Sequence, residues 1–332
     1  MAIRTALSDR FELITVPRMR GVPSFAEDVE RGLRSQPKRL PCKYFYDEVG
    51  SALFDAITHL PEYYLTNAEA EILAKWGWQI VRLLDAPVDF LELGSGSAAK
   101  TRLLIGEALR VQTALRYSPI DISTEALHAS SLALVETYPA LCVRAYAGDY
   151  FDVLESRAVQ LDRKTLAMLM GSNIGNYEPA DARELLGLLG AALRPGDGLL
   201  LGADLKKDRA TLELAYDDPA GVTAAFDRNI LARINRELDA DFEPRNFAHV
   251  ARYDESRASV DSFLEARASA EIYVRSLGLR VGIAEGERIH TESSYKFTDA
   301  EIVELGRTAG FRPASAWHDR ADRFVVHLLV RE

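Results

Sequence analysis

Two glycines, at positions 94 and 96, follow an apolar run from Val88 to Leu93 and precede a helical pattern over 101–109. This is the order of a buried strand, a tight turn and a helix start. Glycines let a ligand come close to the backbone, and the helix N-terminus offers it unpaired N–H groups. Glu92 stands where a nucleotide's ribose or an amino-acid tail would lie. The segment is therefore a candidate nucleotide-binding turn, although a turn without a ligand has the same pattern.

Acidic residues close the next two predicted strands. Asp121 stands 27 residues after Gly94, at the end of an apolar run over 117–122. Folds that bind dinucleotides place an acid about 20 residues on, where it holds ribose hydroxyls. Asp149 and Tyr150 follow the strand over 141–147. A carboxylate beside an aromatic ring suits an adenine, so both acids are candidate cofactor contacts.

The glycine pattern departs from the dinucleotide fingerprint, because Ala99 occupies the place of its third glycine. The combination of E-x-G-x-G, Asp121 and Gly148-Asp149 resembles a class I S-adenosylmethionine-dependent methyltransferase. A nicotinamide oxidoreductase and a catalytically silent nucleotide-binding module remain as alternatives from a different functional class.

Composition narrows the kind of partner. The 332 residues are 48% hydrophobic, enough to fill a core, and no segment is long and apolar enough to span a membrane. The net charge of −10 disfavours nucleic-acid phosphates, so a small-molecule substrate is expected. Six histidines without ligand spacing, and two cysteines, Cys42 and Cys142, indicate no metal site and no disulfide framework. We expect a cytoplasmic, monomeric enzyme, with Cys142 as a small core residue.

Strands alternate with helices through much of the chain, which predicts a parallel, doubly wound α/β sheet. The expected strands are Val88–Leu93, Tyr117–Ile122, Leu141–Ala147, Leu166–Met170 and Gly198–Asp204.

Capping signals mark the helices of the same region. Thr66 and Glu69 have the spacing of a capping box before a helix over 68–84, and Thr298 and Glu301 have it before a helix that ends at Gly310. Another helix is expected over 179–193. Two strands after the last helix, near 314–318 and 324–330, predict an antiparallel hairpin at the sheet edge.

Residues 205–296 break this alternation with helix-rich sequence over 208–238 and then short alternating strands. Such an insert indicates a second α+β domain, a substrate or lid domain, with which the first 66 residues are expected to pack. The predicted methyltransferase domain therefore covers 67–204 and 297–332, and the second domain covers 1–66 and 205–296.

Several motifs outside the nucleotide-binding pattern carry a more specific resemblance. They are Lys43-Tyr-Phe-Tyr-Asp-Glu-Val-Gly-Ser51, Leu60-Pro-Glu-Tyr-Tyr64, Gly171-Ser-Asn-Ile-Gly-Asn176, Leu214-Ala-Tyr-Asp-Asp218, Ala224-Ala-Phe-Asp-Arg-Asn229 and Glu292-Ser-Ser-Tyr-Lys-Phe297. Over nearly the whole chain, the sequence resembles the histidine-specific Nα-methyltransferases of ergothioneine biosynthesis. The resemblance implies S-adenosylmethionine as cofactor, free histidine as substrate, three methyl transfers to its α-amine to give hercynine, and no metal.

The resemblance also implies roles for individual residues. The cofactor contacts it implies are Tyr46, Gly94, Lys100, Asp121, Asp149 and Tyr150. The substrate's carboxylate and amine would be held by Asn176 and Tyr216, and its imidazole by Tyr63, Glu292 and Ser294. Tyr46 and Asn176 are the catalytic candidates.

One position departs from the pattern. Ser262 stands where we align an apolar methionine of the ring pocket, which would make that pocket wider or more polar. Methylation of another free amino acid, such as tryptophan, is therefore an open alternative.

The residue chemistry agrees with methyl transfer without reference to the family. Transfer from a sulfonium to an amine is an in-line displacement, in which alignment and desolvation supply much of the catalysis. An α-amine has a pKa of about 8, so it must lose a proton first, and Tyr46 is a candidate to take or relay it. Glu292 and Ser294 would point the same way on an extended segment.

Overall fold

The computed structural model describes residues 3–18, 23–84 and 87–332. The chain divides into two compact units. Unit 1 is Met1–Arg20, Leu65–Lys206 and Phe297–Glu332, and unit 2 is Gly21–Tyr64 and Lys207–Lys296.

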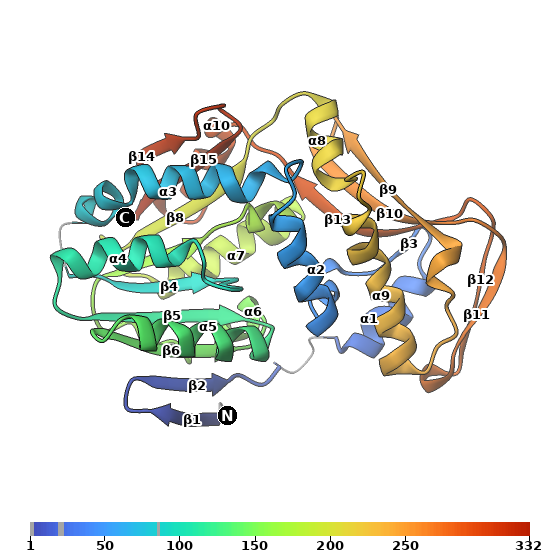
Figure 1. The fold of residues 1–332 in the computed structure, drawn as a ribbon, viewed down its shortest axis with the longest axis horizontal. Helices are drawn as coiled ribbons and strands as arrows, with labels where there is room; N and C mark the ends of the chain where they lie inside the picture. Colours follow the sequence, from blue (N-terminus) through green and yellow to red (C-terminus); the bar gives the residue numbers. More distant parts are fainter. Residues whose placement is uncertain (1–2, 19–22, 85–86) are drawn as a thin grey trace. The chain divides into compact units, whose positions relative to one another are not determined.

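In unit 1 the described residues form a nine-stranded sheet in the order β1-β2-β6-β5-β4-β7-β8-β15-β14 (Figure 1). The strands are β1 (Ile3–Ser8), β2 (Phe11–Thr15), β4 (Asp89–Leu93), β5 (Leu115–Asp121), β6 (Leu141–Ala147), β7 (Thr165–Leu169), β8 (Gly198–Asp204), β14 (Phe311–His318) and β15 (Phe324–Arg331). The helices are α3 (Tyr64–Leu83), α4 (Thr101–Val111), α5 (Thr124–Thr137), α6 (Tyr150–Glu155), the short 3-10 helix η2 (Asn173–Asn176), α7 (Pro179–Ala192) and α10 (Asp299–Thr308).

The parallel centre of this sheet reverses its order beside β4. The chain passes from β4 outward through β5 to β6, and then returns to β7 and β8 on the other side of β4. Ligands of open α/β sheets bind beyond the carboxyl ends of the strands at such a reversal. Here those ends carry the turn after β4 and the segment 171–176 after β7. β15 pairs antiparallel with β8 and with β14, so the predicted class I methyltransferase fold and its C-terminal hairpin are confirmed.

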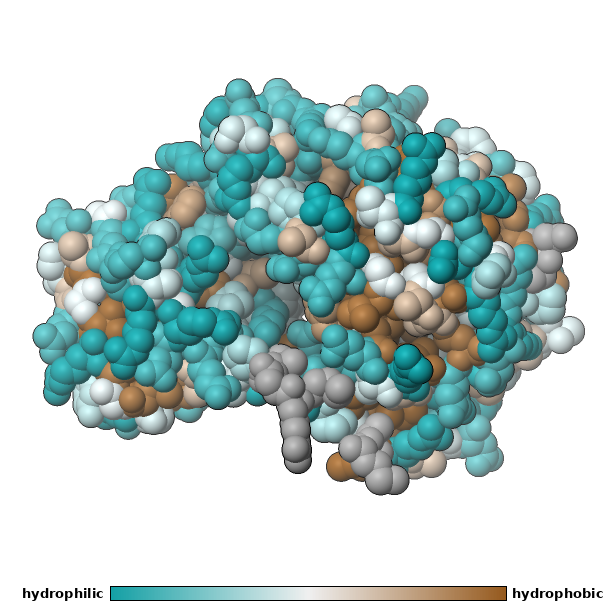
Figure 2. Space-filling view, turned by 180° about the vertical axis from the view of Figure 1, so that it is seen from behind, coloured by the Kyte–Doolittle hydropathy of each residue, from teal (hydrophilic) through white to brown (hydrophobic). Residues whose placement is uncertain are grey.

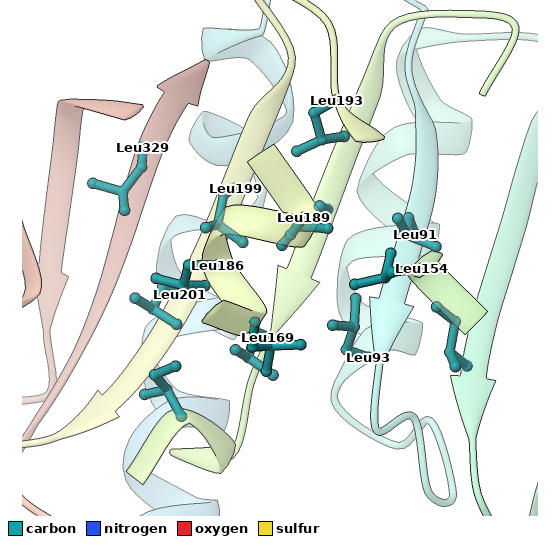
Figure 3. Packing of buried hydrophobic residues seen from close by; sticks show 14 of the residues in the cluster. Leu91, Leu93, Leu154, Leu169, Leu186, Leu189, Leu193, Leu199, Leu201 and Leu329 are labelled. Atoms are coloured by element: carbon teal, nitrogen blue, oxygen red, sulfur yellow. The ribbon is translucent and has the colours of Figure 1, made fainter. Parts of the chain in front are cut away.

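Leucines that alternate along the central strands hold one face of the sheet against helices. Side chains two residues apart on a strand point to the same face, and here they are buried against α6, α7 and α10 (Figure 3). The cluster includes Leu91, Leu93, Leu154, Leu169, Leu186, Leu189, Leu199, Leu201, Ile302 and Leu329. In Figure 1, α3, α4 and α5 lie in front of the sheet and α7 lies behind it. This two-sided cover makes the sheet doubly wound.

The structure differs from the sequence-based domain assignment in the first 20 residues. β1 and β2 form a hairpin, and β2 pairs in parallel with β6, so this segment extends the sheet of unit 1. Phe11 and Ile14 are buried in that position, which gives the physical reason.

Two local predictions are also wrong. α3 begins at Tyr64, before Thr66, and the Glu69 carboxylate bonds to the backbone N–H of Gly171, so the two do not form a capping box there. Cys142 is exposed on β6. It alternates with the buried Leu141 and Val143 and so lies on the opposite face of the strand. The capping box of Thr298 and Glu301 is confirmed.

In unit 2 the described residues form a four-stranded sheet, β3-β13-β10-β9, and a two-stranded sheet, β11-β12 (Figure 1). The strands are β3 (Lys38–Arg39), β9 (Phe247–Asp254), β10 (Ser259–Ala266), β11 (Ala270–Val274), β12 (Leu279–Ile283) and β13 (Arg288–Tyr295). The helices are α1 (Phe25–Arg34), α2 (Glu48–Thr58), α8 (Arg209–Tyr216) and α9 (Val222–Leu238), with short 3-10 helices η1 (Cys42–Phe45), η3 (Pro244–Asn246) and η4 (Arg275–Leu277). α9 packs against α2 and against β9 and β10.

Hydrophilic residues cover most of the face shown in Figure 2, with smaller apolar areas between them. Within the described ranges, no helix is both long and apolar enough to cross a membrane.

Candidate functional site

The turn after β4 packs against two side chains, Tyr150 and Asn173. Gly94 has φ +77° and Gly96 has φ +47°, the left-handed region that glycine adopts without strain. A Cβ on Gly94 would lie 2.2 Å from the Tyr150 hydroxyl and 2.7 Å from Asn173 Nδ2. Tyr150 and Asn173 therefore pack directly against this glycine. Asn173 is absent from the sequence-predicted set, although it lies in the quoted segment 171–176.

Asp121 links the ends of β4 and β5. Its Oδ2 accepts from the backbone N–H of Gly96 at 2.9 Å, and its Oδ1 accepts from that of Ser123 at 3.0 Å. Burial raises the pKa of the carboxyl above its ordinary value, and these N–H groups oppose that rise. Each oxygen keeps acceptor capacity, since a carboxylate has about four lone-pair sites. A contact between Asp121 and the ribose of the cofactor stays a prediction.

Asp149 lies at the end of β6 and is the N-cap of α6. Its side chain accepts from the backbone N–H of Phe151 at 3.0 Å. Asp121 ends β5, and Asp149 and Tyr150 follow β6, which pairs with β5 in parallel. The structure therefore places the two predicted cofactor carboxylates at the carboxyl ends of neighbouring strands.

Lys100 belongs to a polar network that the sequence did not predict, and Asn176 lies in the loop that this network holds. Lys100 Nζ is paired with the fully buried Glu69 carboxylate, which also accepts from the backbone N–H of Gly171 at 2.9 and 3.0 Å. Gly171 begins the segment that ends at Asn176, in η2. Lys100 and Glu69 therefore hold the base of the loop that carries Asn176. A direct cofactor contact by Lys100 stays a prediction.

Glu92 is buried, and its carboxylate accepts hydrogen bonds from other side chains of the protein. Its carboxylate accepts from Thr101 Oγ1 at 2.8 Å and from the Tyr117 hydroxyl. Burial raises its pKa to about 7. These contacts make Glu92 a support that ties β4 to α4 and β5.

In unit 2, one face of β13 carries the imidazole candidates. Glu292 and Ser294 alternate on the strand and so point to the same side, and Lys296, the first residue after the strand, contacts Ser294. Ser294 Oγ and the Tyr216 hydroxyl lie 2.8 Å apart, and the buried Lys296 ammonium donates to Tyr216 at 2.8 Å and to Ser294 at 2.9 Å. The structure thus brings Tyr216 and Ser294 together, and it adds Lys296, which the sequence set left out.

Glu292 is half-buried on the same strand. Burial, assisted by the negative charge of Asp227, raises its pKa to about 7, while the Lys296 and His249 charges oppose the rise. Ser262 is its direct partner across β10 and β13, and Ser262 is buried. The departure from the family pattern therefore lies next to Glu292.

His249 is held in its doubly protonated form. Nδ1 lies 2.6 Å from Asp227 Oδ2, and Nε2 lies 2.8 Å from the backbone oxygen of Tyr216. A carbonyl oxygen only accepts, and so does a carboxylate, so both ring nitrogens donate. Although burial acts to lower the pKa of His249, the Asp227 carboxylate outweighs it and raises that pKa. The imidazolium anchors the end of α8, and with it Tyr216.

The remaining tyrosines belong to one aromatic cluster. The ring of Tyr46 lies 5.5 Å from Phe54 and 5.6 Å from Phe226, and Tyr63 lies 6.2 Å from Phe54 and 6.1 Å from Tyr216. Edge-to-face contacts of this kind stabilise ring orientation. Tyr46 and Tyr63 are therefore fixed relative to Tyr216 within unit 2.

We expect Gly94→Ala to destabilise the protein by about 1–3 kcal/mol, since alanine is strained at this φ and its Cβ displaces Tyr150. Gly96→Ala is the matched control, because it carries a positive φ and its Cβ would meet no atom within 4 Å. In a Tyr150→Phe background, part of the Gly94→Ala cost should disappear. Free energies of unfolding measure both effects. Equal costs at the two glycines, without relief in the double variant, would contradict the contact.

Glu292→Gln should make the protein more stable at a pH of about 8. The folded-state pKa of Glu292 is about 7 against an ordinary 4.5, so its contribution is fully present below pH 4.5 and is lost as pH rises through about 7. Glutamine resembles the neutral form and avoids that loss, which is worth roughly 1–3 kcal/mol. Thermal unfolding at both pH values tests this. Glu287→Gln is the control with the opposite sign, because Lys38 lowers the pKa of Glu287.

Comparison with known proteins gives consistent matches along the chain. The model of the family described as histidine-specific methyltransferase, SAM-dependent, matches residues 25–331. A histidine N-alpha-methyltransferase of Mycolicibacterium smegmatis is 42% identical over 304 residues, which are 92% of this chain and 94% of that protein.

More distant matches extend the set. An ergothioneine biosynthesis protein 1 of Neurospora crassa is 29% identical over 300 residues, which are 89% of this chain and 33% of that protein. A solved structure of a putative methyltransferase from Thermobifida fusca covers 91% of this chain and 97% of its own, with a TM-score of 0.46 and 14% identity. The family match and the identity to the mycobacterial enzyme extend over both units, and the chain belongs to the S-adenosylmethionine-dependent histidine-specific methyltransferase family.

Proposed function

We propose that the protein methylates the α-amine of free L-histidine with S-adenosylmethionine, three times in succession, to give hercynine. The observation that carries the proposal is the acceptor face of β13. There a half-buried carboxylate, Glu292, stands two residues from Ser294, whose hydroxyl is hydrogen-bonded to Tyr216 and Lys296. An imidazole ring carries both a donor and an acceptor nitrogen, and this face offers partners for both.

The cofactor supplies an electrophilic methyl group on a sulfonium. In unit 1, Asp121 would accept hydrogen bonds from its ribose, and Gly94 and Gly96 keep the backbone accessible. Asp149 would accept from the adenine amine, with Tyr150 beside it. These residues bind and orient; none needs to change its covalent state.

The acceptor's amine must lose a proton before each transfer. Each step then breaks the carbon–sulfur bond of the transferred methyl group and forms one carbon–nitrogen bond. One proton leaves the nitrogen before each transfer, three in all, and the trimethylated product keeps a fixed positive charge because its nitrogen carries no proton. Tyr46, oriented by Phe54 and Phe226, is the proposed group to take or relay the proton. Asn176 would hold the substrate's carboxylate or amine, because an amide both donates and accepts.

Ser262 favours a second candidate, methylation of another free amino acid such as tryptophan. It is buried directly across from Glu292, so a larger or more polar ring pocket would begin at this position.

In the deciding experiment, the protein is incubated with S-adenosylmethionine and an equimolar pool of free amino acids, and mass spectrometry follows the mass of each amino acid. We expect histidine to gain three methyl groups and the others to remain unchanged. Preferential methylation of tryptophan would support the second candidate, and no methylation at all would overturn both.

A further inference from the structure

Glu69 of α3 is a fully buried carboxylate that stands outside the predicted set of site residues. Its Oε2 accepts from the ammonium of Lys100 and, at 2.9 Å, from the backbone N–H of Gly171, and its Oε1 accepts from the same N–H at 3.0 Å. A carboxylate is rarely buried unless cations and N–H groups compensate for the lost water. Glu69 therefore joins two separate segments, the residue before α4 and the loop after β7.

The strand β8 leaves room for this carboxylate at one position. β8 is buried along its whole length, and Gly202 lies in its interior. A Cβ on Gly202 would overlap Oε1 of Glu69. Glycine inside a strand weakens the strand and often marks the close approach of another group. Gly202 thus provides the space that the Glu69 carboxylate occupies.

The loop after β7 has a backbone that needs such support. Gly171 has φ +72° and Ser172 has φ +57°, so two successive residues lie in the left-handed region. This region is costly for serine, and residues in it persist where surrounding groups hold them. Ser172 is buried, its Oγ accepts from the backbone N–H of Asp204 at 3.0 Å, and its backbone oxygen accepts from that of Gly175 at 2.8 Å. Glu69 holds the residue before it.

The same loop connects the cofactor turn with the proposed acceptor residue. Asn173 packs against Gly94, and Asn176, at the end of η2, is the residue proposed to hold the acceptor. A displacement of about 1 Å between reacting groups can cost about a hundredfold in rate. The direction in which the loop leaves β7 therefore sets where Asn176 lies relative to the cofactor turn.

We propose that Glu69 is a positioning residue for methyl transfer. By holding the Gly171 N–H and the Lys100 ammonium together, it fixes the loop 171–176, and with it Asn176, against the turn at Gly94. The inference rests on the proposed function, since it takes Asn176 as the group that holds the acceptor's carboxylate or amine. It does not depend on which side chain the acceptor carries, because all free amino acids share that carboxylate and amine.

Glu69→Met removes the carboxylate oxygens and keeps most of the side-chain volume. At saturating S-adenosylmethionine, we expect kcat/KM for the methylated amino acid to fall about ten- to hundredfold, because the loop no longer presents Asn176 correctly. Glu69→Gln should restore most of this loss, since an amide oxygen in the place of Oε2 still accepts from both Gly171 and Lys100.

A double-mutant cycle with Asn176→Ala distinguishes positioning from a general contribution to stability. If Glu69 acts through Asn176, Glu69→Met should cost about twofold at most in the Asn176→Ala background. A residue that only stabilises the fold would cost the same factor in both backgrounds.

Gly202→Ala tests the same carboxylate without removing it, and it serves if the Glu69→Met protein does not fold. The new Cβ displaces the end of the Glu69 side chain, so kcat/KM should fall about tenfold, and much less in the Asn176→Ala background. Gly198→Ala is the matched control, because Gly198 begins the same strand and its Cβ would meet the ends of three leucine side chains instead. It should leave kcat/KM nearly unchanged in both backgrounds.

The outcomes separate this inference from the proposed function. In a protein that methylates an amino acid, a cost of Glu69→Met or Gly202→Ala that is absent, or equal in the two backgrounds, overturns the role of Glu69 and leaves the proposed function standing. Equal costs of Gly202→Ala and Gly198→Ala would also overturn it. If the wild-type protein methylates no free amino acid, the proposed function itself fails, and this inference fails with it.

Discussion

Glu292→Ala is expected to lower kcat/KM for histidine ten- to hundredfold while the affinity for the demethylated cofactor stays the same. The removed carboxylate is half-buried, and a charge-assisted hydrogen bond to such a group is worth about 1.5–3 kcal/mol. The cofactor residues Asp121 and Asp149 belong to unit 1, and Glu292 belongs to unit 2. Steady-state kinetics with histidine and tryptophan, and calorimetry with S-adenosylhomocysteine, measure the two effects.

Glu287→Ala is the matched control for this variant. Glu287 precedes β13 and pairs with Lys38, so its loss removes a carboxylate of unit 2 without touching Tyr216 or Ser294. The ratio of tryptophan to histidine turnover should rise in Glu292→Ala and stay constant in the control. Unchanged histidine turnover in Glu292→Ala would show that the imidazole is bound elsewhere.

Asp121→Ala is expected to weaken the binding of S-adenosylmethionine and its demethylated product by at least 1.5–3 kcal/mol, or about ten- to hundredfold in Kd. This loss of binding free energy corresponds to the charge-assisted hydrogen bonds between Asp121 and the ribose hydroxyls. The structure adds a second cause, because the same carboxylate holds the backbone N–H groups of Gly96 and Ser123. Its removal therefore also loosens the glycine turn.

Calorimetry with S-adenosylhomocysteine checks this result, with NAD as a ligand that should not bind. Asp181→Ala is the control, since Asp181 is exposed in the first turn of α7 and is not among the residues predicted to contact the cofactor. Full cofactor affinity in Asp121→Ala would remove Asp121 from the site.

The pattern of neighbouring residues in the sequence was sufficient to predict most of the strands and helices of unit 1. β6 and β8 have the predicted bounds, and the Thr298–Glu301 capping box is present, because strand alternation and capping depend on residues near in the sequence. The hairpin of β1 and β2 was missed. Its strands are short, β1 is exposed along its whole length, and the pairing of β2 with β6 joins segments more than 120 residues apart.

Glu69 shows how a local motif misleads. T-x-x-E has the spacing of a capping box, but the carboxylate is bonded to Gly171 and paired with Lys100, 102 and 31 residues away. Nothing in the neighbouring residues indicates partners at such distances.

The sequence by itself determined the strand–turn–helix at Gly94, the acids Asp121 and Asp149 that follow, and, through its motifs, the family. These features depend on residue type and short spacing. Only the tertiary structure decided that Lys296 lies between Tyr216 and Ser294, 80 and 2 residues away, and that Glu292 has a pKa of about 7. Hydrogen-bond direction and desolvation depend on which distant segments pack around a side chain, and the chain acquires them only when it folds.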